Sequence, residues 1–273
     1  MASRRQLDFE AFLADHPVFS TRELACARGA PDEERAAYEQ LKHHLNTGRV
    51  KQVVRGLYAA VPPGVDAKGF QPDRYLVGAA AEQQGVFAYH AALELLGLAQ
   101  SVWRECALHC DRPRSAIALE AATVVFLPQP RPLRRRHLLD LGLHLVPHET
   151  RRLRVTGPER TLVEGFRQPH RVGGLAEFLA SAGGLALLDF ELLEEVLAAY
   201  GQRSLWAAVG WFAETYGDRF RPPKSFLERC RIERPRSRQY LVRDRRGGTS
   251  LAGWNLILPA GIETELEDHA GYA

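Results

Sequence analysis

The stretch Phe19–Leu24, with the sequence FSTREL, decides how the N-terminal part of the chain folds. Ser20 and Glu23 stand at the spacing of a capping box, in which each of the two side chains binds the backbone N–H of the other residue. This spacing predicts a short helix that starts after Ser20 and ends near Gly29. An amphipathic pattern over residues 7–15 predicts another short helix before it.

The segment that follows has the pattern of a longer helix. Pro31 and Asp32 open it, and Gly48 ends it. Its apolar residues recur at helical spacing, so one face is expected to pack against the rest of the domain. These residues are Ala37, Leu41 and Leu45.

Two short runs with strand character come next, at residues 50–54 and 57–61. Arg55–Gly56 separates them, and a two-residue connection of this kind is typical of a β-hairpin. A helix, a helix-turn-helix and a hairpin in this order predict a winged helix-turn-helix domain over residues 1–62. The prolines and the glycine at 62–64 end this domain and mark a linker.

The rest of the chain, residues 66–273, combines strand-like runs with longer amphipathic runs. Strands are expected at residues 86–87, 103–109, 123–127, 141–146, 151–155, 239–243 and 254–258. Helices are expected at residues 72–83, 89–96, 158–166, 174–182, 190–200, 205–216 and 223–231. The predicted fold class is α+β, with the N-terminal winged helix-turn-helix followed by a larger mixed α/β domain.

Composition restricts the class of protein and its location. The 273 residues are 45% hydrophobic and 25% charged, with a formal net charge of +3, which are values of an ordinary globular protein. No apolar run approaches the roughly 18 residues of a membrane span, and the first residues lack the apolar core of a signal peptide. We therefore expect a cytoplasmic protein with no membrane contact, whose four cysteines are reduced thiols.

The third predicted helix has the features of a DNA-reading element. The second helix of a helix-turn-helix lies in the major groove, where its exposed face contacts base edges. Between residues 35 and 55, five basic residues stand against one acidic residue. Arginine pairs with guanine and lysine with guanine or phosphate, whereas cations of the wing suit phosphates or the minor groove. The predicted DNA-binding residues are Thr21, Arg22, Arg35, Tyr38, Glu39, Lys42, His43, Arg49, Lys51 and Arg55.

Other interpretations of the charged residues stay open. The N-terminal charges also fit a solvated surface, or a winged helix that binds only protein. The longer domain carries arginine clusters that fit an acidic protein surface, an RNA, or solvent alone. The candidate partner surface in this domain consists of Arg134, Arg135, Arg136, Arg234, Arg236 and Arg238, and the last cluster continues to Arg243, Arg245 and Arg246.

Catalytic and metal-binding motifs are not found. The sequence has no GxSxG, phosphate-binding P-loop or HExxH motif. Two groups of metal-ligating residue types occur, His144 with His148 and Glu149, and Cys106 with the segment 109–111. No second ligand pair with zinc-site spacing follows either group. We therefore predict no enzymatic activity, no cofactor and no metal.

Several segments together resemble one known family. They are Phe19–Leu24, Val54–Tyr58, Tyr89–Leu98, Val155–Glu164, Arg167–Pro169, Gly173–Gly174 and Trp254–Pro259. In this order and spacing the chain resembles the AbiEi-type antitoxins, the regulator half of bacterial AbiE toxin–antitoxin and phage-defence (abortive infection) pairs. Val155–Glu164, with the sequence VTGPERTLVE, is the most specific of these segments.

The resemblance implies a transcriptional autorepressor and antitoxin of a type IV system. In such a system the winged helix binds double-stranded DNA at an inverted-repeat operator of its own operon, as a monomer or weak dimer that binds cooperatively. Residues 66–273 then form the antitoxin domain, which counters a co-encoded nucleotidyltransferase-like toxin without a stable complex. Within the segment PERTLV, Arg160 is expected to be exposed and joins the candidate partner surface.

Two further interpretations belong to other classes of protein. One is a defence nuclease that a winged helix directs to its target, which the missing acidic–lysine catalytic set argues against. The other is a stand-alone winged-helix transcription factor whose longer domain senses a ligand or a protein. The gene next to this one distinguishes an antitoxin from a stand-alone regulator.

Overall fold

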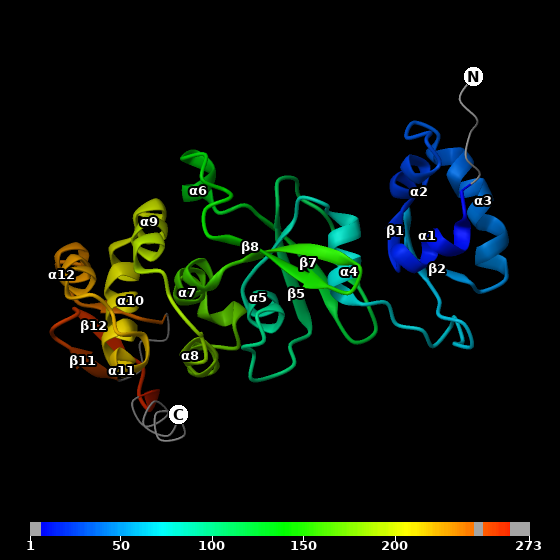
Figure 1. Ribbon diagram of the computed structural model, residues 1–273. Helices are drawn as coiled ribbons and strands as arrows, with labels where there is room; N and C mark the ends of the chain where they lie inside the picture. Colours follow the sequence, from blue (N-terminus) through cyan, green and yellow to red (C-terminus); the bar gives the residue numbers. More distant parts are fainter. Residues whose placement is uncertain (1–6, 243–247, 263–273) are drawn as a thin grey trace. The chain divides into compact units, whose positions relative to one another are not determined.

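The computed structural model describes residues 7–242 and 248–262 (Figure 1). These residues form a mixed α+β fold with three sheets among them, so the predicted class is confirmed at that level. No helix in the described part of the chain is long and apolar enough to span a bilayer.

The N-terminal helices and strands lie close together in Figure 1, where α1, α2, α3, β1 and β2 are labelled. They are α1 (Phe9–Asp15), β1 (Val18–Ser20), α2 (Thr21–Ala27), α3 (Glu34–Asn46), β2 (Val50–Val54) and β3 (Leu57–Ala60). The strands form an antiparallel sheet in the order β1-β3-β2, with Val18 opposite Ala59 and Lys51 also opposite Ala59. The sequence did not reveal β1, because three residues are too few to show an alternating pattern.

Helix α3 starts later than the sequence predicts. Pro31 and Asp32 lie in a turn, and the helix begins at Glu34 without a side-chain cap on its first N–H groups. Its predicted inner face is largely correct, because Ala37 and Leu41 are fully buried and Leu45 is partly buried. These residues pack with Phe12, Phe19 and other apolar residues of α1, α2 and the sheet. Full burial of a leucine or phenylalanine side chain, as at Leu41 and Phe19, contributes roughly 1.5–3 kcal/mol.

The chain divides into two compact units. The first unit consists of the described parts of residues 1–85, 104–127 and 145–153, and the second consists of the remaining described residues. Besides the N-terminal elements, the first unit contains α4 (Arg74–Ala81), β5 (Glu105–Cys110), β6 (Ile117–Ala118) and β7 (Thr123–Pro128). Helix α4 packs against β1 and β3. That residues 1–62 fold without the rest stays a prediction.

Most of the helices belong to the second unit. They are α5 (His90–Leu95), α6 (Arg131–Arg135), α7 (Pro158–Arg167), α8 (Leu175–Gly183), α9 (Phe190–Tyr200), α10 (Arg203–Thr215), α11 (Gly217–Phe220), α12 (Lys224–Glu233) and the 3₁₀ turn η1 (Pro169–Arg171). Its core lies along α7 and α10, where Phe166, Phe178 and Phe212 pack edge to face.

The remaining strands complete two further sheets. They are β4 (Val86–Phe87), β8 (Leu143–His148), β9 (Arg151–Thr156), β10 (Gln239–Tyr240), β11 (Thr249–Leu251) and β12 (Leu256–Leu258). The six-stranded sheet has the order β6-β7-β5-β4-β9-β8, with Phe87 opposite Val155 in a parallel pair. The small sheet has the order β10-β12-β11. Strand β10 ends at Tyr240, and the predicted continuation to Arg243 reaches residues outside the described part.

Candidate nucleic-acid interface

The capping box predicted in FSTREL is present. The Ser20 hydroxyl oxygen accepts the Glu23 backbone N–H at 3.1 Å, and a Glu23 carboxylate oxygen accepts the Ser20 N–H at 2.8 Å. These bonds satisfy N–H groups that have no partner within the helix. The first turn of α2 therefore has one defined geometry.

Thr21, the first residue of α2, joins three elements at one point. Its backbone N–H donates to the carbonyl of Gly56, in the turn between β2 and β3, at 3.1 Å. Its hydroxyl donates to the carboxylate of Glu34, the first residue of α3, at 3.1 Å. Gly56 has a φ of +80°, a conformation that glycine adopts without strain. We call these three residues, Thr21, Glu34 and Gly56, the Thr21 junction.

Three arginines are sequence neighbours of the Thr21 junction. Arg22 follows Thr21, Arg35 follows Glu34, and Arg55 precedes Gly56. All three side chains are exposed, and within the described residues none of them has a hydrogen-bond or ion-pair partner. The three arginines therefore flank the Thr21 junction, in α2, in α3 and in the turn between β2 and β3.

The outward face of α3 is exposed as predicted. Arg35, Tyr38, Glu39, Lys42 and His43 are all exposed, opposite the buried residues of the helix. The Lys42 ammonium lies 2.6 Å from the Glu39 carboxylate and 5.8 Å from the centre of the Tyr38 ring. Lys42 is therefore partly neutralised by a neighbour on the same helix.

The structure assigns protein partners to two of the predicted wing cations. Arg49 forms an ion pair with Glu10. The Lys51 ammonium donates to the backbone carbonyls of Lys68, at 3.1 Å, and Phe70, at 2.7 Å. Lys51 thus holds the segment after the hairpin. Of the three predicted wing cations, Arg55 alone lacks a partner within the described residues.

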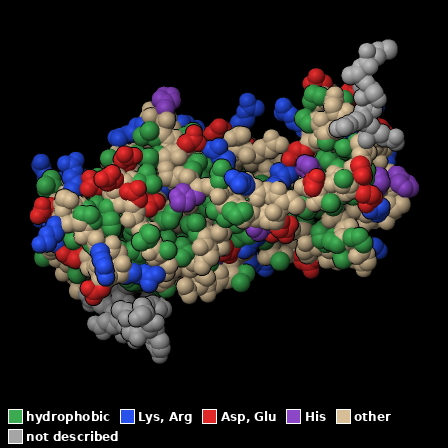
Figure 2. Space-filling view, viewed as in Figure 1, with side chains coloured by type: hydrophobic (Ala, Val, Ile, Leu, Met, Phe, Trp, Pro, Cys, Tyr) green, Lys and Arg blue, Asp and Glu red, His purple; other side chains and the backbone are tan. Residues whose placement is uncertain are grey.

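Acidic residues limit the overall attraction of this region for a polyanion. Asp32, Glu33 and Glu34 are exposed and directly precede Arg35. Basic and acidic side chains are interspersed over the face shown in Figure 2. Any attraction of this region for a polyanion therefore depends on where individual cations stand, and not on a broad positive field.

Sequence reasoning missed Arg151 as a part of this region. This residue of β9 donates from one guanidinium nitrogen to the Glu23 carboxylate and to the Val18 carbonyl, each at 2.8 Å. In the sequence it is one of three arginines that stand close together, with Arg152 and Arg154. Glu23 lies 128 residues before it in the sequence, and no local pattern signals a contact of that range.

The arginines of the candidate partner surface differ in their surroundings. Arg134, Arg135 and Arg136 are exposed at α6, where Arg136 donates to the carbonyl of Ala198 at 2.7 Å. Arg236 and Arg238 are also exposed, whereas Arg234 is half-buried and donates to the carbonyl of Arg231. The predicted members Arg243, Arg245 and Arg246 lie outside the described residues.

The prediction that Arg160 is exposed is wrong. Its side chain is fully buried in α7 and donates to the Glu164 carboxylate at 2.9 Å. It also donates to the carbonyls of Leu139, at 2.7 Å, and Leu141, at 3.2 Å. Charged residues are rarely buried unless they are paired, and Glu164, four residues later, supplies the pairing. Arg160 is therefore unavailable to a partner.

Neither group of metal-ligating residue types noted in the sequence comes together as a set among the described residues. Within the described residues, the one set of this kind is Asp73, His148 and Glu149. One Asp73 oxygen already accepts the Leu76 N–H at 2.8 Å and lies 3.1 Å from the His148 ring nitrogen. The Asp73 carboxylate is thus already used within the fold, as the cap of α4 and as the partner of His148.

A buried histidine in the second unit holds two carboxylates. The two His90 ring nitrogens lie 3.1 Å from Glu94 and 3.0 Å from Glu177, and its ring stacks on Trp103 at 5.3 Å. Burial by itself lowers the pKa of His90, but the hydrogen bonds and charges of the two glutamates outweigh burial, so the pKa is raised. The ring therefore bridges Glu94 of α5 and Glu177 of α8.

His90→Gln is expected to lower the free energy of unfolding at pH 6 by about 1–3 kcal/mol. A raised pKa in the folded state gives stability that is fully present below the ordinary histidine value of about 6.5 and is lost as pH rises through the folded value. The difference between wild type and variant should therefore shrink between pH 6 and pH 9. Urea unfolding at both pH values measures it, with His170→Gln, at an exposed histidine, as the control. An equal difference at both pH values contradicts the ionic bridge.

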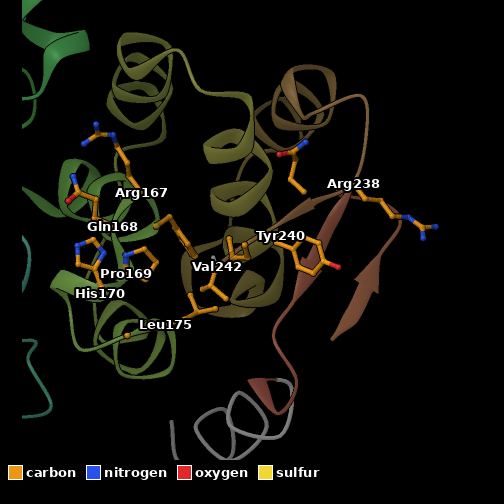
Figure 3. Close-up of a pocket in the computed structure, with 12 residues that line it drawn as sticks. Arg167, Gln168, Pro169, His170, Leu175, Arg238, Tyr240 and Val242 are labelled. Carbon is orange, nitrogen blue, oxygen red and sulfur yellow. The ribbon is translucent and has the colours of Figure 1, made fainter. Parts of the chain in front are cut away.

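The second unit also has an open pocket of about 1090 Å³ (Figure 3). Its walls come from the end of α7, from η1 and from the segment 238–242. The Arg238 side chain extends away from it in Figure 3. The pocket wall ends at Val242, next to residues outside the described part. The described walls bring together no catalytic set.

Comparison with known proteins supports the architecture. The crystal structure of the RV2827C protein from Mycobacterium tuberculosis superimposes with a TM-score of 0.58 and 20% sequence identity, over 99% of this chain and 94% of that chain. No protein-family model and no curated protein matches the chain. At this level of identity, the likeness shows that the two chains share a fold.

Proposed function

We propose that the chain is a sequence-specific DNA-binding regulator whose N-terminal part is a winged helix-turn-helix. The single observation that supports it best is the set of three free arginines, Arg22, Arg35 and Arg55, around the Thr21 junction. In this proposal α3 enters the major groove and the turn between β2 and β3 acts as the wing. A junction that links the starts of α2 and α3 to the wing keeps the three cations in register with one another.

The antitoxin part of the proposal rests on the resemblance to AbiEi-type proteins. It adds autorepression of an operon and neutralisation of a nucleotidyltransferase-like toxin, with the exposed arginines of α6 as the candidate surface. A stand-alone winged-helix regulator is the alternative. Because α4 packs against β1 and β3, a fragment that starts at residue 66 would expose the apolar side of α4. Toxin neutralisation is therefore best tested with the full-length chain.

Binding of the purified full-length chain to the DNA upstream of its own gene tests the proposal. Specific DNA-binding proteins typically bind their sites about 10³-fold or more tightly than unrelated DNA at physiological salt. Fluorescence anisotropy should show such a ratio between the upstream duplex and a scrambled duplex of equal length. Three phosphate contacts per chain would give a salt slope of about −3. Equal affinities for both duplexes would contradict sequence-specific recognition.

A further inference from the structure

We infer that Arg151 is a positioning residue for DNA recognition, because it holds the first turn of α2 from strand β9. The inference rests on the proposed DNA-binding function and adds a residue that no sequence motif marks. Arg151 acts in this account through Glu23 and Val18, and not by touching DNA.

The contact is charged, short and largely shielded from solvent. One Arg151 nitrogen lies 2.8 Å from a Glu23 carboxylate oxygen and 2.8 Å from the Val18 carbonyl. The exposed fractions of the two side chains are 18% for Arg151 and 13% for Glu23. Charge-assisted hydrogen bonds are about twice as strong as neutral ones, and solvent screens this pair less than a pair on the surface.

The two acceptors lie on either side of the Thr21 junction along the chain. Val18 is in β1, opposite Ala59 of β3, and Glu23 is the capping-box residue of α2. Between them stand Thr21, which contacts the wing turn and the start of α3, and the free Arg22. Arg151 therefore fixes both ends of the short segment on which the proposed DNA face is built.

Arg151 also compensates the charge of Glu23. The other Glu23 oxygen accepts the Ser20 N–H and hydroxyl, at 2.8 and 3.0 Å, which stabilises the carboxylate without cancelling its charge. Without Arg151, a half-buried negative charge stands one residue from Arg22. Such a charge attracts that guanidinium and repels the DNA phosphates that approach it.

The turn between β8 and β9, which directly precedes Arg151, is held in place by contacts with α4. His148, at the end of β8, is paired with the α4 cap Asp73 at 3.1 Å. The His148 ring packs edge-on against Tyr75, with ring centres 5.1 Å apart. Helix α4 in turn packs against β1. These contacts fix the turn before β9, from which Arg151 reaches Val18 of β1 and Glu23 of α2.

Arg151→Met in the full-length chain is the test, with Arg152→Met as the matched control. Arg152 is the exposed neighbour and has no partner within the described residues. Arg151→Met should lower affinity for the specific duplex roughly 10-fold or more, with little change on scrambled DNA. The salt slope should stay unchanged, since no phosphate contact is lost. Arg151→Lys, which can still donate to both acceptors, should retain most of the affinity, and Arg152→Met should resemble wild type.

Hydrogen exchange of the α2 amides separates this inference from the proposed function. Exchange should be faster in Arg151→Met than in Arg152→Met. Loosened α2 amides with unchanged specific affinity would overturn the inference and leave the DNA-binding proposal standing. A fall in the salt slope by about one unit would also overturn it, because Arg151 would then contact phosphate directly. Absence of specific binding by the wild type would overturn the proposed function and this inference together.

Discussion

Arg160→Met is expected to lower the free energy of unfolding by about 3–5 kcal/mol, the usual effect of removing one partner of a buried ion pair. The substitution leaves the Glu164 carboxylate, which is fully buried, without its cation. Equilibrium urea unfolding of the full-length chain, followed by circular dichroism, measures the loss. A loss below about 1 kcal/mol would mean that Glu164 finds other compensation.

The surroundings of Arg160 explain why the effect should be large. Its guanidinium binds the carbonyls of Leu139 and Leu141, and Glu164 also accepts the hydroxyl of Tyr200, at the end of α9. Burial by itself lowers the pKa of Arg160, but the charges and hydrogen bonds of Glu164 and Tyr200 together outweigh burial and raise the pKa. One ion pair therefore fixes α7, α9 and the segment before β8.

A double variant tests whether the stability of the fold depends on the ion pair or on each charge separately. Arg160→Met combined with Glu164→Leu removes both charges, so no uncompensated charge stays buried. Its loss of stability should be smaller than the sum of the two single losses. Arg152→Met, at an exposed position, should change stability by less than about 0.5 kcal/mol. Additive losses in the double variant would contradict an interacting pair.

These contacts give the segment Val155–Glu164 a structural role. Thr156 and Thr161 share a buried hydrogen bond at 2.7 Å, and the Glu159 carboxylate accepts the Asp189 N–H at 2.8 Å. Arg160, the residue of this segment that was expected to be exposed for a partner, is likewise used inside the fold. Its resemblance to the family motif therefore has a folding explanation that needs no surface function.

Replacing Arg22, Arg35 and Arg55 together by alanine is expected to weaken specific DNA binding by about 3 kcal/mol or more, roughly a 100-fold loss. Each arginine that contacts a base contributes at least about 1 kcal/mol to specific binding. A change of about 1.4 kcal/mol in binding free energy corresponds to a tenfold change in affinity. All three side chains are exposed and have no partner in the described part of the chain, so the fold should be retained. Fluorescence anisotropy with the upstream duplex measures the affinity, and circular dichroism checks the fold. The same variant provides a full-length, non-repressing chain for toxin-neutralisation assays.

The sequence predicted those elements whose signals are local. The capping box at Ser20 and Glu23 is found as expected, and α9 spans the predicted residues 190–200. Short elements were missed, as β1 and α6 show, because a few residues carry no measurable period. The outward face of α3 followed from helical spacing alone, since its buried positions were recognisable.

Contacts between distant segments were beyond the reach of sequence patterns. Arg160 was expected outside because charged residues usually are, and its pairing with carbonyls at Leu139 and Leu141 depends on the tertiary fold. Lys51 was assigned to DNA binding by its charge, and Arg151 was not assigned to this region at all. The structure gives Lys51 two backbone carbonyls and Arg151 the capping box of α2. Charge identifies candidate residues, and only the fold shows which charges are free.

The central claim is that DNA is read by the free cations around the Thr21 junction, and a comparison of two triple variants tests it most directly. One variant lacks Arg22, Arg35 and Arg55, and the other lacks Lys42, Arg49 and Lys51, so each loses three positive charges. Affinities for the upstream and scrambled duplexes are measured at one fixed salt concentration. The account predicts that the first variant loses discrimination between the duplexes, whereas the second retains most of it. Retained discrimination in the first variant, together with its loss in the second, would contradict the account.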